Sequence, residues 1–370
     1  MSGRASLVLA LVGCGRVGFD AQCGIDALTI SPTAAHANFD SLVQFDATGG
    51  CPPYRFTQTG PGEIDVDGRY VTTSQVGTSE VTVTDTLGDT ARATLEIGGT
   101  SLWFLGGAVN EVPKDEIWRS DDGLAWTMVG TLPVPVRSAA TLVFDDRIWV
   151  IGGTDAQASD AVWVSADGVT WSQAGRLPAP DSYPSAAVFE RQIWVIGGNG
   201  VPGQVLTSND GAAWAHAGDL PILSHGASAI VHRGRLWYLG GHDVDNVLYD
   251  EARSTIDGAS WTVEGRLPSE RELTGSWIAN DQLVVAGGLG AAELDEVVTS
   301  SDGVTWTVEG TLPATRYYGG FAELGARRWA VGGTDGGAVW SSADGLSWTV
   351  EDANFPLPRS DGGLVAFMPR

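Results

Sequence analysis

The chain has 370 residues, of which 50 are glycine, and its formal net charge is -24 at pH 7. Such an acidic surface repels phosphate backbones and anionic lipid headgroups. Nucleic acid is therefore not an expected partner, and binding to a membrane through charge is not expected either. All fifteen tryptophans lie at or after Trp103 and all three cysteines lie in the first hundred residues, which predicts two separate domains.

The N-terminus carries an export signal. Arg4 precedes the apolar run Ala5–Val12, which is too short to span a bilayer as a helix. The residues Leu11–Cys14 match a lipobox, and the segment resembles a bacterial lipoprotein signal. The resemblance implies that residues 1–13 are removed and that the thiol of Cys14 is acylated, so membrane contact is expected through the lipid only. A plain secretory signal followed by a free cysteine is the alternative.

Residues 14–26 are expected to form a tether. Gly15 stands where an aspartate retains many such lipoproteins in the inner membrane, so the outer membrane or the cell surface of the envelope is favoured. Cys23 and Cys51 would then share a compartment that permits a disulfide, but sequence leaves open whether the two thiols meet.

Residues 27–98 have the pattern of a small β-sandwich. Turns rich in Gly, Pro and Asp separate expected strands at residues 28–30, 42–45, 54–57, 69–73, 81–85 and 93–97. The run ATGGCPPYRF from Ala47 and the later VTVTD from Val81 resemble bacterial immunoglobulin-like (Ig-like) domains of surface proteins. The resemblance implies a spacer that holds the next domain away from the membrane.

Residues 99–370 repeat one unit six times. Each unit has a strand ending in Gly-Gly, a Ser/Thr-x-Asp-Gly turn, a tryptophan and a Leu-Pro. The tryptophans are 42 to 47 residues apart, at Trp126, Trp171, Trp214, Trp261, Trp306 and Trp348. A period of this length made only of short strands predicts a β-propeller with four strands in each blade.

The double glycine after the second strand and the tryptophan on the fourth strand resemble the kelch family of propellers. The turns SADGVTW from Ser165 and SADGLSW from Ser342 depart from that family and resemble the Asp-box hairpins of secreted propellers. Their aspartate can accept hydrogen bonds from nearby backbone N–H groups while the glycine takes a positive φ, so we expect a structural role for them.

The two ends of the repeat region predict how the ring closes. The first unit starts directly at Ser101–Leu105 and lacks an innermost strand, whereas GGLVAFMPR is left over at the C-terminus. Pairing these two segments would remove two exposed sheet edges. The predicted fold is therefore all-β: a six-bladed kelch-type β-propeller closed by N- and C-terminal strands, preceded by a small Ig-like β-sandwich.

Length variation among the units lies in the loop between the second and third strands, because the distance from the second glycine to the tryptophan varies from 15 to 20 residues. These loops and the starts of the innermost strands emerge on one face, which is the expected ligand face. Different residue types occupy these starts in the six units, which favours ligand binding. Alternatively, their side chains could simply hydrate the channel mouth. The predicted ligand-binding residues are Arg137, Ser182, Tyr183, His225, Arg271, Glu272, Arg316, Tyr317 and Arg359.

Arginines beside tyrosines suit a carboxylate, an acidic sugar or an acidic peptide. His225 is expected opposite His242 across a hairpin, with Glu272 at the start of the next innermost strand. Two histidines and a carboxylate can ligate a divalent ion, so these three residues are weak metal candidates. Chance polar residues are commoner at a loop-rich mouth, and no metal is predicted.

Enzymatic function is a second possibility. Copper oxidases of the galactose oxidase type are excluded because no cysteine follows Cys51. Arg137, Arg316, Arg359, Tyr317 and Glu272 imitate a sialidase set, but the Arg-Ile-Pro signature of that family is absent. The chain is also similar to the six-bladed kelch mutarotase that acts on sialic acid, which implies an arginine-rich mouth.

No GxSxG elbow, HExxH motif or phosphate loop is present. The sequence therefore favours a lipid-anchored, non-catalytic protein that binds a protein or glycan ligand and uses no cofactor. A carbohydrate-active enzyme of the mutarotase or sialidase type is the alternative. The sequence does not indicate an oligomeric state.

Overall fold

The computed structural model describes residues 26–37, 42–73, 77–334, 337–355 and 358–369. The chain forms two compact units, residues 1–98 and 99–370. The described residues of both units contain strands and no α-helix, so no helix in them could cross a membrane. Cys51 is buried and disulfide-bonded. The predicted signal peptide, Cys14 and Cys23 lie outside the described residues.

The first unit is a β-sandwich. One sheet contains β2 (Ala34–Ala37), β9 (Thr90–Ile97), β8 (Gly77–Thr84) and β5 (Arg55–Thr59), and β2 runs parallel to β9. A second sheet contains β3 (Leu42–Gln44), β7 (Arg69–Val71) and β6 (Glu63–Ile64). A third pairs β1 (Thr29–Ser31) with β4 (Asp46–Thr48). Alternate side chains of the different sheets share one core, which includes Phe45, Tyr70, Val83 and Leu95.

The second unit contains six four-stranded sheets in its described part, here called blades 1 to 6. Blade 1 is built from β14 (Thr127–Thr131), β13 (Glu116–Ser120), β10 (Ser101–Leu105) and β37 (Gly363–Phe367). Blade 2 has β15 (Ala140–Phe144), β16 (Arg147–Ile151), β17 (Ser159–Ser165) and β18 (Ser172–Asp181). Blade 3 has β19 (Ser185–Phe189), β20 (Gln192–Ile196), β21 (Gln204–Ser208) and β22 (Ala215–Asp219).

The remaining blades repeat the pattern. Blade 4 has β24 (Ser228–His232), β25 (Arg235–Leu239), β27 (Glu251–Thr255) and β28 (Thr262–Arg266), and blade 5 has β29 (Gly275–Ala279), β30 (Gln282–Ala286), β31 (Glu296–Ser300) and β32 (Thr307–Thr311). Blade 6 has β33 (Gly320–Leu324), β34 (Arg327–Val331), β35 (Val339–Ser342) and β36 (Thr349–Glu351). Two short ribbons lie in loops: β11 (Ala108–Val109) with β12 (Val112–Pro113), and β23 (Ser224–His225) with β26 (His242–Asp243).

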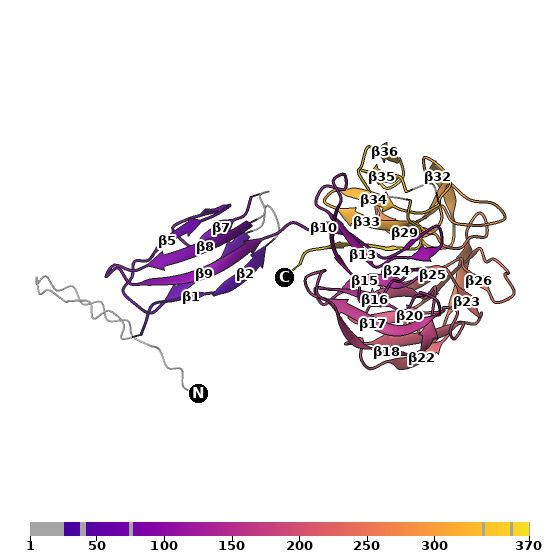
Figure 1. Ribbon diagram of the computed structural model, residues 1–370, viewed down its shortest axis with the longest axis horizontal. Coiled ribbons are helices and arrows are strands. Elements are labelled where there is room, and N and C mark those ends of the chain that lie inside the picture. Colours follow the sequence, from indigo (N-terminus) through magenta and orange to yellow (C-terminus); the bar gives the residue numbers. More distant parts are fainter. Residues whose placement is uncertain (1–25, 38–41, 74–76, 335–336, 356–357, 370) are drawn as a thin grey trace, which may run out of the picture. The chain divides into compact units, whose positions relative to one another are not determined.

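The blades form a closed β-propeller (Figure 1). Their innermost strands contact one another in the order β37, β15, β19, β24, β29, β33 and back to β37. The predicted closure is present: β37 pairs antiparallel with β10, with Ser101 opposite Phe367 and Leu105 opposite Gly363. The sheet edge that β10 would otherwise expose is thereby covered.

The innermost strands begin later than predicted. β15 starts at Ala140, not at Arg137, because Ser138 has a φ of 56° and interrupts the extended backbone. The residues expected to open these strands therefore lie in the connections that lead into them. They still face the loops after Gly-Gly, since Arg137 and Thr154 exchange backbone hydrogen bonds of 3.0 and 2.8 Å.

Candidate functional site

Six equivalent residues surround the propeller axis and are called the mouth ring: Ser138, Tyr183, Gly226, Leu273, Tyr318 and Asp361. All six have left-handed backbones, with φ between 56° and 68°. The backbone N–H of each donates to the carbonyl oxygen of the ring residue in the preceding blade, at 2.7 to 3.4 Å, and the N–H of Ser138 closes the circle on Asp361. The circle holds the backbone at the mouth in one conformation whatever the side chain is.

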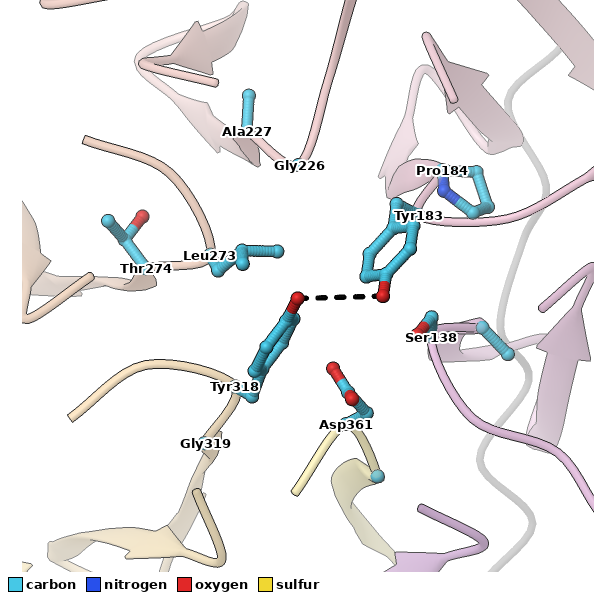
Figure 2. A pocket seen from close by; sticks show the side chains of 12 residues that line it. Ser138, Tyr183, Pro184, Gly226, Ala227, Leu273, Thr274, Tyr318, Gly319 and Asp361 are labelled. Atoms are coloured by element: carbon cyan, nitrogen blue, oxygen red, sulfur yellow. Dashed lines mark hydrogen bonds between the residues drawn. The ribbon is translucent and has the colours of Figure 1, made fainter. Parts of the chain in front are cut away.

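The mouth ring encloses a cavity of about 150 Å³, here called the axial cavity. Each blade contributes the ring residue and the residue after it; these second residues are Ala139, Pro184, Ala227, Thr274, Gly319 and Gly362. Figure 2 shows the phenol groups of Tyr183 and Tyr318 turned toward one another, with the carboxyl group of Asp361 beside them. The cavity is therefore polar on one side and lined by small or apolar groups on the other.

The polar side has unused hydrogen-bonding capacity. Tyr318 donates its phenolic proton to the oxygen of Tyr183 at 3.5 Å, which leaves the proton of Tyr183 for another acceptor. The hydroxyl oxygen of Ser138 is buried and has no hydrogen-bond partner in the described chain. Burial raises the pKa of Asp361 to about 7, although the charge of Arg137 acts in the opposite direction. Burial also raises the pKa of Tyr318.

A second hollow of about 420 Å³, here called the side pocket, shares Tyr183, Leu273 and Tyr318 with the axial cavity. Loops after Gly-Gly supply most of its other walls, which are Asn199, His225, His242, Asp243, Val244, Asn246 and Glu272. The prediction that variable loops and inner-strand connections meet at one face is thus confirmed for these blades.

The predicted opposition of His225 and His242 is also confirmed. The two residues pair across β23 and β26, and their ring centroids are 3.8 Å apart. Nδ1 of His242 contacts the Glu272 carboxylate. Burial and the nearby His242 lower the pKa of His225 to about 4, so His225 is neutral at pH 7. Among the described residues no group of three His, Cys, Asp or Glu side chains has the arrangement of a metal site.

The prediction that Arg271, Arg316 and Arg359 face a ligand is wrong. All three are at most 1% exposed. Arg271 donates to Glu296 at 2.7 Å and to the hydroxyl of Ser269 at 2.6 Å. A buried guanidinium is stable only when paired in this way, so this arginine fixes the loop after Gly-Gly.

Arg316 and Arg359 have the same role in their own blades. Arg316 donates to the carbonyl of Ala338 at 2.7 Å, and its guanidinium lies 3.4 Å from the ring centroid of Trp340. Arg359 pairs with Glu116 and donates to the carbonyl of Gly106 at 3.1 Å. The sixth unit has one more residue between its tryptophan and the ring than the others, so Ser360, not Arg359, is equivalent to Arg137.

The other six predicted residues fall into three groups. Tyr183, His225 and Glu272 line the two hollows. Ser182 is buried and Tyr317 packs beside the Tyr318 ring at 5.0 Å, and neither lines these two hollows. Arg137 is 28% exposed, with Nη1 3.9 Å from the Asp361 carboxylate.

Sequence reasoning did not place Ser138 and Asp361 at the site. Both lie in the connection that precedes an innermost strand. The repeat alignment selected Arg137, one residue before Ser138, and Arg359, two residues before Asp361. The signal available in the sequence was the position itself, because the ring residue directly precedes a small residue or proline in each unit. A left-handed backbone at a serine or an aspartate leaves no distinctive motif.

Comparison with known proteins agrees with the fold. The model of the DUF6242 beta propeller domain matches residues 121–225. The solved structure of YjhT is similar, with a TM-score of 0.52 and 16% sequence identity, and the match covers 67% of this chain and 96% of that one. No curated protein matches the chain. At this identity the likeness shows a β-propeller and says nothing about the ligand.

Proposed function

We propose that the protein is an extracytoplasmic binding protein whose propeller mouth recognises a protein or glycan ligand. One observation carries the proposal: a closed circle of backbone hydrogen bonds keeps six positions equivalent, yet their side chains are unlike. Stability alone would not require a tyrosine pair and a buried carboxyl group around an open cavity. Polar groups that converge on a hollow are the usual mark of a ligand site.

The proposed location follows from the sequence alone. Cys14 would carry the lipid anchor, with the mature chain at the outer membrane or the cell surface. The β-sandwich of the first unit, which we assign to the Ig-like class, would act as a spacer, and the repeats of the propeller would be of the kelch type. Each of these assignments rests on the motifs described above.

The enzyme alternative loses its main support. A sialidase-like or mutarotase-like site on this scaffold was expected to use several arginines at the mouth. Arg316 and Arg359 are buried and paired with their own blades, so Arg137 alone of the three imitating arginines is partly exposed beside the mouth ring. We therefore favour binding over turnover.

Filling the axial cavity tests the proposal. We expect Ser138→Trp in the full-length protein to abolish capture of ligands found by a glycan array and a protein pull-down, because the indole occupies the space between the ring side chains. The matched control is Ser301→Trp, an exposed serine in a Ser-x-Asp-Gly turn. Equal thermal stability of both variants shows that the fold is intact. Undiminished capture by a folded Ser138→Trp protein would show that the mouth is not the site.

A further inference from the structure

The carboxyl group of Asp361 lies at the mouth, and its one ion-pair contact within the described residues is with Arg137. Its side chain is 4% exposed and points into the axial cavity (Figure 2). Arg137 is its partner in the described chain, and the closest approach of the two groups, 3.9 Å, is too long for a hydrogen bond. A buried carboxyl group without hydrogen bonds costs free energy, which a ligand can recover by donating to it.

Two further groups face the same space with complementary needs. The phenol of Tyr183 retains a proton to donate, and the hydroxyl oxygen of Ser138 is buried without a partner in the described residues. The cavity thus offers an acceptor, a donor and a hydroxyl that can do either. Groups of this kind match a ligand whose own groups both donate and accept, as alcohol hydroxyls do.

Each charged group at the mouth already has a partner in the described chain. Asp361 lies beside Arg137, and Glu272 lies against His242. The carboxylate of Asp243 accepts hydrogen bonds from the N–H groups of Asp245 and Val247, both at 2.9 Å, and from the phenol of Tyr249 at 2.9 Å. An anionic ligand finds one partly exposed arginine, and a cationic ligand that approaches Asp361 meets Arg137.

Aromatic surface completes the site. The rings of Tyr183 and Tyr318 lie between the axial cavity and the side pocket and border both, with centroids 6.1 Å apart. A ligand in the side pocket can therefore pack a C–H face on these rings while its hydroxyl groups reach the axial cavity. A pyranose ring has one apolar face and a rim of hydroxyls, which suits this arrangement.

We propose that the axial cavity and the side pocket together bind an uncharged sugar residue, with hydroxyl groups bonded to Asp361, Tyr183 and Ser138 and the ring packed on the tyrosines. This inference rests on the proposed function, because it names the ligand class of the same mouth. It replaces the acidic ligand expected from sequence, since three of the four arginines that suggested it are buried.

Matched sugars test the charge preference directly. In both the gluco and the galacto series, titration calorimetry of the full-length protein compares the methyl glycoside of the neutral hexose, its uronate and its 2-amino derivative, alongside an array of neutral, acidic and amino glycans. We expect the neutral member or a neutral array glycan to bind at least tenfold more tightly than its charged counterparts. Tighter binding of a uronate or an amine, or no neutral glycan bound, overturns the inference.

Three variants assign the contacts. Asp361→Asn and Tyr183→Phe should each weaken binding of the selected neutral glycan at least tenfold. The matched control is Asp181→Asn, because Asp181 is equally buried with a pKa raised to about 7 but accepts a hydrogen bond from the N–H of Gly200 at 2.8 Å and lies outside the cavity. Affinity unchanged in a folded Asp361→Asn protein refutes the proposed contact.

The inference and the proposed function can fail separately. If a charged ligand binds and Ser138→Trp abolishes its binding, the mouth remains the site but the neutral-sugar assignment is wrong. If a neutral glycan binds equally to wild type and to Ser138→Trp, the protein binds neutral sugars but not at the mouth. In that case both the proposed function and this inference are wrong about the site.

Discussion

At each position of the mouth ring the backbone conformation is fixed, but the type of side chain is free to vary. Five of its six residues are not glycine, yet all are left-handed, at a cost of about 1 to 2 kcal/mol each. The circle of backbone hydrogen bonds among the ring residues compensates for that cost. Because the bonds involve only backbone atoms, Ser138, Leu273 and Asp361 fit equivalent places with unrelated chemistry. Substitution at the ring should therefore alter recognition more than folding.

Buried aspartates should make stability depend on pH. Asp361 and Asp181 have pKa values raised to about 7 by burial, above the ordinary value of 3.8. The folded protein therefore holds these two protons more tightly than the unfolded chain does. Their stabilising contribution is complete below pH 3.8 and is lost as the pH rises through about 7. We expect Asp361→Asn to flatten the decrease in the free energy of unfolding between pH 4 and 7, measured by urea titration.

The exposed Asp352 provides the comparison for that measurement. Asp352→Asn also removes one carboxyl group, but from the surface, and the pH profile of Asp361→Asn is compared with the profile of this variant. An identical profile in Asp361→Asn and Asp352→Asn would mean that Asp361 ionises normally in the folded protein, in which case its burial at the mouth is relieved by solvent.

The turns between the third and fourth strands hold each blade together and also join neighbouring blades. In blade 4, Asp257 accepts from the N–H groups of Ala259 and Ser260 at 2.9 and 2.8 Å. These backbone bonds lower the pKa of Asp257 to about 2, and the bond from Ser260 has the largest effect. The same bonds recur in the other five described turns, at Asp122, Asp167, Asp210, Asp302 and Asp344. The structural role expected for these turns from their sequence agrees with this geometry.

The glycine of the turn has a second function that sequence did not reveal. A Cβ on Gly258 would overlap the ring of Trp194 in the preceding blade. We expect Gly258→Ala to lower the free energy of unfolding by about 3 kcal/mol, because a left-handed alanine and an overpacked contact add their costs. Chemical denaturation of the full-length protein measures this change.

Gly234→Ala is the matched control, since Gly234 has nearly the same φ, 71° against 73°, and no atom of the described residues lies within 4 Å of the place that a Cβ would take there. It should cost only the backbone part, about 1 kcal/mol. Equal losses in the two variants would mean that the tryptophan contact contributes nothing to stability.

Periodic features of the fold could be predicted from sequence, and unique features of the site could not. The repeat located the strands of the blades and the pairing of Ser101–Leu105 with the C-terminus, because each depends on a pattern that occurs many times. Trp277 illustrates the limit: blade 5 has Val284 where other blades have the tryptophan that covers a turn glycine, and Trp277 from β29 covers Gly345 instead. Likewise, the burial of Arg271 depends on Glu296, a contact that spacing alone does not show.

At the scale of the whole molecule, each unit has its own core. Val83 is buried in the first unit, and Val285 is buried between blades of the second. We expect two calorimetric transitions. Val83→Ala should lower the free energy of unfolding of the first unit by about 2 kcal/mol and shift its transition alone. Val285→Ala should shift the other transition alone.

The two valines serve as controls for each other, because each removes the same two methyl groups from a fully buried position. A shift of both transitions by either variant would show that the units unfold as one cooperative body rather than as two.

Closure by β37 has a consequence for how the protein is made. The indole of Trp103 donates to the carbonyl of Phe367 at 3.1 Å, across 264 residues of chain. A chain synthesised from its N-terminus cannot form this contact until Phe367 has emerged, and contacts so distant in sequence form slowly. Five complete blades and an unpaired β10 edge must therefore wait for β37. A chain truncated before Gly363 would keep that unpaired edge, which is a template for pairing with other chains.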